Sequence, residues 1–294
     1  MKMYELIKVG EQSYYIESPA RIGVYVENGT EAYLIDSGND KDAGRKIRQI
    51  LDTNGWTLKA IINTHSNADH IGGNQYLQKQ TGCKIFSRGI EAAFTRYPVL
   101  EPSFLFGGYP LKELQHKFLM AKPSEVTEIC DADFPKSLSV IDLPGHFFDM
   151  IGIRTPDGVA FIADCLNSKE TLDKYKFTFI YDVEAYLHTL EQVGKMQAKM
   201  FVPAHAKPTE DIQELVQYNI SKVYENAEFL IALCEKPMNF EIILQQVFTQ
   251  HNLVMNYEQY ALLGSTIRSY LSWLKNSGKL VTEFVDNMLL WKKV

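Results

Sequence analysis

Residues 63–74 read NTHSNADHIGGN, and this stretch decides how the rest of the chain is interpreted. It places His65, Asn67, Asp69 and His70 within six residues, at the end of the apolar run LKAIINT, which is typical of a strand. Ligand sites of layered α/β proteins lie beyond the carboxyl ends of strands. Imidazole nitrogen and carboxylate oxygen are the usual ligands of Zn²⁺ and of neighbouring first-row metals. The stretch therefore predicts a metal site on a loop at a strand end.

Three further candidate ligands lie where apolar runs end. His146 follows LSVIDLPG, Asp164 ends GVAFIAD, and His205 follows KMFVPA. We expect these strand ends to meet the first loop at one edge of the fold. The remaining histidines of the chain lie in helical or loop contexts, and we expect them to be ordinary core or surface residues.

The chain around these motifs alternates between strand and helix patterns. Residues 88–125 interrupt the alternation with prolines, glycines and aromatic residues. A segment of this length with turns is a candidate lid or pocket wall. The alternative is a long surface loop that packs on the fold without a role in binding. We expect Phe104, Phe106 and Tyr109 to line a substrate pocket that favours a partly apolar substrate.

The segments AYLIDSG, NTHSNADHIGGN, LPGHFFD, FIADCL and PAH follow one another over about residues 30–205. In order and context they resemble the five motifs of the metallo-β-lactamase superfamily. The resemblance implies an α/β fold, the αββα sandwich, in which two sheets face each other with helices outside and metals at the edge. It also implies a metal-dependent hydrolase of the glyoxalase II-like branch.

The resemblance assigns roles to individual residues. It implies that His65 and His146 hold a first metal, that Asp69, His70 and His205 hold a second, that Asp164 bridges the two, and that Asp36 orders the ligand loop. Asp69 is also the candidate catalytic residue, because it can orient a water molecule. Zinc is the expected metal, and iron or manganese are alternatives.

Asn67 departs from the family pattern, which usually has histidine at this position. An amide oxygen is a weaker ligand than imidazole, so Asn67 is a poor substitute in the first metal site. We therefore expect one tightly bound metal and one that is loosely bound or absent.

The character of the sequence changes after residue 234. NFEIILQQVFTQH and TIRSYLSWLKNSG read as amphipathic helices, and the last seventeen residues read as a hairpin that turns at Asp286 and Asn287. This order predicts a catalytic domain over residues 1–234 and a winged-helix-like domain over residues 235–294. The charges of the second domain nearly balance, which favours packing, oligomerisation or a substrate wall over nucleic-acid binding.

Composition restricts the class of protein. The 294 residues carry a net charge of −6, so the basic excess of a nucleic-acid-binding surface is missing. No apolar run is long enough for a signal peptide or a membrane span, which predicts a cytoplasmic protein. The four cysteines lie far apart, and we expect them to be buried free thiols.

The expected function is hydrolysis of a small-molecule ester, thioester, lactone or phosphodiester by a metal-activated water. A homodimer is the assembly considered. Three alternatives stay open. One is an iron-dependent redox enzyme on the same fold, similar to a persulfide dioxygenase. The others are a nuclease and a non-catalytic binding module with a degenerate metal site.

Overall fold

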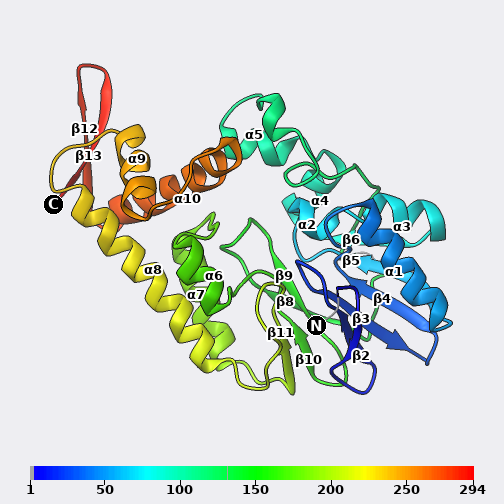
Figure 1. Cartoon of the computed structure of the whole chain (residues 1–294). Helices are drawn as coiled ribbons and strands as arrows, with labels where there is room; N and C mark the ends of the chain where they lie inside the picture. The colour runs from blue at the N-terminus through cyan, green and yellow to red at the C-terminus, as the bar shows by residue number, and fades with distance from the viewer. Residues whose placement is uncertain (1–2, 131) are drawn as a thin grey trace.

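A computed structural model describes residues 3–130 and 132–294. Two sheets pack face to face, and helices cover the outer face of each (Figure 1). Apolar side chains from both sheets, among them Tyr25, Ile62, Ile153 and Phe161, share one buried cluster between the sheets. The predicted αββα sandwich is confirmed.

The larger sheet has the strand order of the chain. Neighbours from β1 to β4 are antiparallel, and those from β4 to β7 are parallel. Its strands are β1 (Leu6–Lys8), β2 (Ser13–Ile16), β3 (Ile22–Glu27), β4 (Glu31–Ile35), β5 (Thr57–Ile62), β6 (Lys84–Ser87) and β7 (Thr127–Glu128).

The smaller sheet has the order β11-β10-β9-β8, and only β10 and β11 are parallel. Its strands are β8 (Ser139–Asp142), β9 (Ile151–Arg154), β10 (Val159–Phe161) and β11 (Met200–Val202). Helices α7 (Val183–Lys195) and α8 (Gln213–Leu233) cover its outer face (Figure 1).

The alternation of side chains along each strand builds the layers. In β3, Val24 belongs to the cluster under the outer helices, whereas Tyr25 belongs to the cluster between the sheets. Ile47 and Leu51 supply the helix side of that outer cluster from α1 (Lys41–Thr53). Two short helices follow β5: α2 (Ala68–Ile71), which carries the candidate ligands Asp69 and His70, and α3 (Asn74–Thr81).

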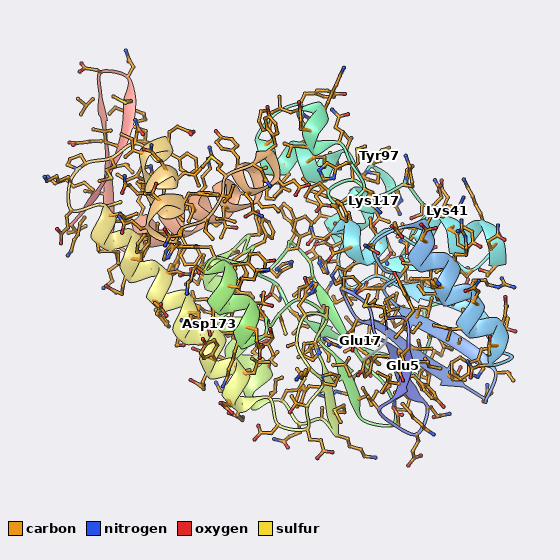
Figure 2. All side chains as sticks on the ribbon, in the orientation of Figure 1. Glu5, Glu17, Lys41, Tyr97, Lys117 and Asp173 are labelled. Atoms are coloured by element: carbon orange, nitrogen blue, oxygen red, sulfur yellow. The ribbon has the colours of Figure 1, made fainter. Side chains whose placement is uncertain are left out.

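The aromatic segment folds into α4 (Gly89–Arg96), α5 (Leu100–Phe106) and the 3-10 helix η1 (Lys112–Leu114). Just after η1, Lys117 donates a hydrogen bond to Asp40 (2.8 Å), which caps the N-terminus of α1 (Figure 2). A further short helix, α6 (Lys169–Tyr175), lies between β10 and α7 in the chain.

The C-terminal segment contains α9 (Phe240–Gln250) and α10 (Tyr257–Asn276), followed by a hairpin of β12 (Leu280–Val285) and β13 (Met288–Lys293). Asp286 and Asn287 form the turn with positive φ of 49° and 61°, as the favoured two-residue hairpin turn requires. The predicted order of two helices and a hairpin is confirmed, whereas the winged-helix-like domain stays a prediction.

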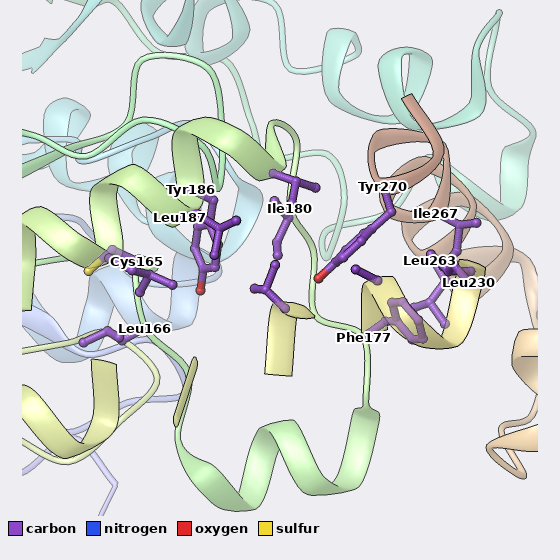
Figure 3. Packing of buried hydrophobic residues seen from close by; sticks show 14 of the residues in the cluster. Cys165, Leu166, Phe177, Ile180, Tyr186, Leu187, Leu230, Leu263, Ile267 and Tyr270 are labelled. Atoms are coloured by element: carbon purple, nitrogen blue, oxygen red, sulfur yellow. The ribbon is translucent and has the colours of Figure 1, made fainter. Parts of the chain in front are cut away.

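The C-terminal segment shares its core with the sandwich. Leu263, Ile267 and Tyr270 of α10 belong to the same buried cluster as Phe177 and Leu187 (Figure 3). One continuous apolar cluster thus crosses residue 234, where the sequence predicts the boundary between two domains.

The cysteines are free thiols, as predicted. Cys83, Cys165 and Cys234 are buried, but the prediction of burial is wrong for Cys130, which is exposed. It lies in the turn that follows the two-residue strand β7, where backbone leaves the sheet. No helix in the described ranges has the length and apolar character needed to span a membrane.

Candidate metal centre

The ends of β4 and β5 place the first residues of the site. Ile35 pairs with Ile62 in parallel register, so the two strands leave the sheet side by side. The Asp36 carboxylate then accepts hydrogen bonds from the backbone N–H (2.8 Å) and the hydroxyl (2.7 Å) of Thr64. These bonds hold the start of the ligand loop against the strand end, as the resemblance implies for Asp36.

The smaller sheet supplies the other side of the site in the same way. Phe161 pairs with Val202, so Asp164 and His205 each lie three residues beyond neighbouring parallel strands. His146 follows Gly145, whose φ is 117° and whose added Cβ would lie 2.2 Å from the backbone of Tyr186. Only glycine fits this turn, which brings His146 to the same edge.

Three of the four histidines have their Nδ1 atom tied to an acceptor. Nδ1 lies 2.7 Å from Asp36 Oδ2 in His70, 3.0 Å from the Phe179 carbonyl in His146, and 3.1 Å from the Pro19 carbonyl in His205. An acceptor at Nδ1 favours the tautomer whose Nε2 lone pair is free. In the fourth, His65, Nδ1 lies 3.0 Å from the Thr64 hydroxyl.

The free Nε2 atoms converge on Asp164. Its Oδ1 lies 3.1 Å from His70 Nε2, and its Oδ2 lies 3.1 Å from His205 Nε2 and 3.6 Å from His146 Nε2. Asp69 Oδ2 lies 3.6 Å from His205 Nε2 and 3.7 Å from His70 Nε2. Asp164 therefore lies between the candidate ligands, as expected of a bridging carboxylate.

Ligand atoms form two overlapping groups within 4.8 Å: His65, His70 and Asp164, and Asp69, His70 and His205. Within the described ranges, His65 Nε2, His70 Nε2 and Asp164 Oδ1 are buried with no hydrogen-bond partner. Buried polar atoms are normally paired, so converging lone pairs of this kind fit a bound cation. A divalent metal ion matches this donor set.

Asn67 also faces the centre. Its Oδ1 lies 3.2 Å from His146 Nε2, and its Nδ2 donates to the Glu101 carboxylate (2.8 Å). The structure therefore places all seven predicted ligand candidates in one cluster at the sandwich edge.

Burial and charge set the protonation of the cluster in opposite directions. Burial lowers the pKa of His65 well below its usual value, with a further contribution from His70. Burial also lowers the pKa of His70, but Asp164, Asp69 and Asp36 outweigh it and raise that pKa well above the usual value. Carboxylates thus dominate the potential of the site, which favours a cation.

Two buried carboxyl groups beneath the loop were missed by the sequence analysis. Glu91 of α4 accepts from the backbone N–H (3.0 Å) and the hydroxyl (2.5 Å) of Ser66 and from the Asp149 N–H (2.9 Å). Burial raises the pKa of Glu91 to about 7. Glu101 of α5 holds Asn67. Neither position carries a signal in the sequence, because both lie in a segment without regular motifs.

A cavity of about 690 Å³ opens beside His146, Asp164 and His205. Part of its wall comes from the C-terminal helix α10, through Gln259, Leu262, Leu263 and Thr266, and another part from Tyr175 and residues 177–179. Two of its lining residues, Glu17 (labelled in Figure 2) and Arg21, form an ion pair (3.1 Å). Arg21 also donates to the Ala206 carbonyl (2.6 Å).

Phe104, Phe106 and Tyr109 are predicted from the sequence to line the substrate pocket, but the wall of the cavity beside the metal centre comes from other residues. None of the three is among the described residues that line the cavity beside the metal centre. Phe104 packs edge-on against Phe148 and Tyr181, whereas Phe106 and Tyr109 are exposed. Phe104 instead lines a separate cavity of about 460 Å³ together with residues of α10, and a loop-length argument does not predict this packing.

Comparison with known proteins agrees with the geometry. The family model described as the metallo-beta-lactamase superfamily matches residues 23–205, which is more than half of the chain. The chain belongs to the metallo-beta-lactamase superfamily. The matched range contains every candidate ligand of the metal centre and ends at His205.

Curated relatives of this superfamily member match only over part of their length. A hydroxyacylglutathione hydrolase of Hyphomonas neptunium is 30% identical over 112 residues, which cover 38% of this chain and 35% of the relative. An uncharacterized protein of Mycobacterium leprae is 29% identical over 124 residues, with 40% and 53% covered. The chain thus spans about a third to a half of the length of these relatives.

Solved structures extend the metallo-beta-lactamase likeness over the whole chain. A beta-lactamase domain protein from Burkholderia ambifaria superposes with a TM-score of 0.73 at 16% identity, covering 99% of this chain and 94% of that one. A metallo-beta-lactamase family protein from Thermus thermophilus gives 0.71 at 17% identity, covering 98% and 97%. At these identities the likeness concerns the fold, including the C-terminal segment.

Proposed function

We propose that this protein is a metal-dependent hydrolase of a small, partly apolar ester or thioester. One observation carries the proposal. His65 Nε2, His70 Nε2 and Asp164 Oδ1 are buried and make no well-aligned hydrogen bond within the described chain, and their ligand atoms lie within 4.8 Å of one another. A divalent cation held there lowers the pKa of water and polarises a carbonyl group, which is the chemistry that hydrolysis needs.

The side chains around the cation have separate tasks. The proposed ligands are His65, His146, Asp164, His70, His205 and Asp69. Asp69 is the proposed catalytic residue, because its side chain is 37% exposed whereas that of Asp164 is 9% exposed. Its carboxylate is therefore open to solvent, where it can orient a water molecule.

The cavity supports an uncharged, partly apolar acyl group as substrate. Leu262, Leu263 and Phe179 supply apolar wall, and Arg21 is engaged by Glu17 and by backbone carbonyls. A relative named for hydrolysis of hydroxyacylglutathione, which is a thioester, supports the thioester among the expected bonds. Lactones and phosphodiesters belong in the same test, because they are cleaved by the same chemistry.

We propose zinc as the metal, since histidine nitrogen with aspartate oxygen is a common zinc set. Iron and manganese also accept these donors. An iron-dependent redox enzyme on the same fold would be distinguished by oxygen consumption of the iron-loaded protein in the absence of hydrolysis.

The test is a substrate panel on chelator-stripped protein that is reloaded with zinc, manganese or iron. The panel holds a glutathione thioester, p-nitrophenyl esters of increasing acyl length, a lactone and bis-p-nitrophenyl phosphate. We expect metal-dependent cleavage of an ester or thioester and its loss in His70→Ala. The matched control is His188→Ala, because His188 is an exposed histidine of α7 that contacts Gln192. Equal activity before and after stripping, or no hydrolysis in any loaded form, would contradict the proposal.

A further inference from the structure

The side chain of Asn67 is held between two groups from distant parts of the chain. Its Nδ2 donates to Oε1 of Glu101 at 2.8 Å, and its Oδ1 lies 3.2 Å from His146 Nε2. The amide therefore has a defined orientation, with its nitrogen toward the acid and its oxygen toward the metal centre.

The position of Asn67 in the fold makes this orientation informative. Asn67 is the N-cap residue of α2, with extended backbone angles of −60° and 144°. An asparagine at this position normally accepts a hydrogen bond from the first turn of its helix. The Asn67 side chain makes no such cap bond within the described chain, so its oxygen stays available at the centre.

Glu101 is well placed to impose this arrangement. It is 5% exposed and comes from α5, thirty-four residues along the chain from Asn67. The apolar residues Leu105 of α5 and Ala261 of α10 share a buried cluster, which fixes the helix that carries Glu101. A buried carboxyl group is costly unless it is hydrogen-bonded, and Asn67 supplies a donor to it.

We propose that Glu101 is a positioning residue that turns the Asn67 amide oxygen toward the metal centre and makes it a neutral ligand beside His65 and His146. This inference rests on the metal site of the proposed function. An amide nitrogen has no available lone pair for a cation, so only this orientation lets Asn67 bind. Without an acceptor at position 101 the amide rotates freely and its oxygen is no longer aimed at the centre.

The experiment measures metal affinity in the whole protein, separately from activity. Competition with a chromophoric chelator gives the affinity of each zinc equivalent, and the absorption spectrum of the cobalt-loaded protein reports the ligand set. We expect Glu101→Leu to weaken one equivalent by about 10- to 100-fold and to change the cobalt spectrum. Glu101→Gln keeps a carbonyl acceptor for Asn67 Nδ2 and should stay near the wild-type affinity.

A double-mutant cycle separates positioning from a merely structural role. In an Asn67→Ala background, Glu101→Leu should cause no further loss, because the residue through which it acts is gone. Additive losses, or an unchanged affinity in folded Glu101→Leu, would overturn the proposal. If Glu101→Leu does not fold, the metal affinity of Asn67→Ala tests the proposal. If this variant binds both zinc equivalents as tightly as the wild type does, the Asn67 amide is not a ligand and the proposal is overturned.

The failures of the two proposals can be told apart. A wild-type protein that binds no zinc or cobalt would contradict the proposed metal-dependent function and this inference together. A wild-type protein that binds and hydrolyses normally, while its variants at positions 67 and 101 keep the same metal affinities, would contradict this inference alone.

Discussion

The Nδ1 atom of His70 lies 2.7 Å from Oδ2 of Asp36, and this contact joins the end of β4 to the ligand loop after β5. The same carboxylate holds Thr64 through its backbone and side chain. Asp36 adopts a positive φ of 67°, which turns its side chain back toward the loop. One residue thus sets both the path of the loop and the tautomer of His70.

The variant Asp36→Asn tests the contact between Asp36 and His70. Asparagine tolerates the positive φ of position 36, so the backbone is preserved. Its amide cannot accept from Thr64 and His70 together as the carboxylate does, so the His70 ring loses its fixed tautomer. We expect metal affinity to fall by about 10- to 100-fold, measured by chelator competition.

The matched control is Asp42→Asn, since Asp42 is exposed on α1 and pairs with Arg45. It should bind metal as the wild type does. An Asp36→Asn protein with wild-type affinity would show that the contact with His70 plays no part in metal binding.

The two halves of the centre should bind metal unequally. The half with Asp69, His70 and His205 has charged and imidazole donors, whereas the other half has the neutral Asn67 amide. Calorimetric titration of stripped protein with zinc should therefore give one tight and one weaker equivalent, and Asn67→His should strengthen the weaker one. Two equally tight equivalents in the wild type would contradict this prediction.

Glu91 should make stability depend on pH. Burial raises its pKa to about 7 from 4.5, so the folded state holds a proton that the unfolded state loses first. The stabilisation is complete below pH 4.5 and is lost as the pH rises through 7, and it amounts to about 3 kcal/mol. Denaturant unfolding at about pH 5 and about pH 8, on either side of that folded-state pKa, measures it.

Glu91→Gln carries no charge at either pH, so the stability of the wild type relative to this variant should be larger at the lower pH than at the higher one. Glu228→Gln, at an exposed position of α8, serves as the control and should follow the wild type. If the free energy of unfolding of the wild type exceeded that of Glu91→Gln by the same amount at both pH values, Glu91 would not have the raised pKa.

The wall from α10 should select the acyl group. Leu262 lines the cavity, so Leu262→Ala removes apolar contact with a longer acyl chain. We expect kcat/KM for a long-chain ester to fall by about 10-fold, mainly through KM, while a short-chain ester is little affected. Phe106→Ala, which changes an exposed residue outside the cavity, should leave both unchanged. If Phe106→Ala lowered kcat/KM for the long-chain ester and Leu262→Ala did not, the pocket wall would lie in the aromatic segment.

Thiol reactivity should single out one cysteine. Burial raises the pKa of the Cys83 and Cys165 thiols, and that of Cys234 to about 11. Cys130 is exposed. Ellman's reagent should therefore react rapidly with one thiol in the native protein and with four after denaturation, and Cys130→Ser should abolish the rapid phase. Rapid labelling that survives in Cys130→Ser would contradict the burial of the others.

The sequence by itself determined the candidate ligands, and its resemblance to the metallo-β-lactamase superfamily predicted the sandwich. Apolar runs that end in His65, Asp164 or His205 can be read locally, because a strand end and its polar residue are neighbours in the chain. Since parallel strands end at one edge, these local signals predict a shared site. The departure at Asn67 is equally visible in the sequence.

Only the tertiary structure decided what surrounds those ligands. Glu101 reaches Asn67, and Leu262 reaches the cavity, through the packing of α5 against α10, which are separated by some 150 residues. Contacts of this kind depend on how whole helices pack, and no pattern within either helix records them. The pocket wall was therefore assigned to the aromatic segment from sequence, although packing brings α10 into the wall of the cavity beside the metal centre.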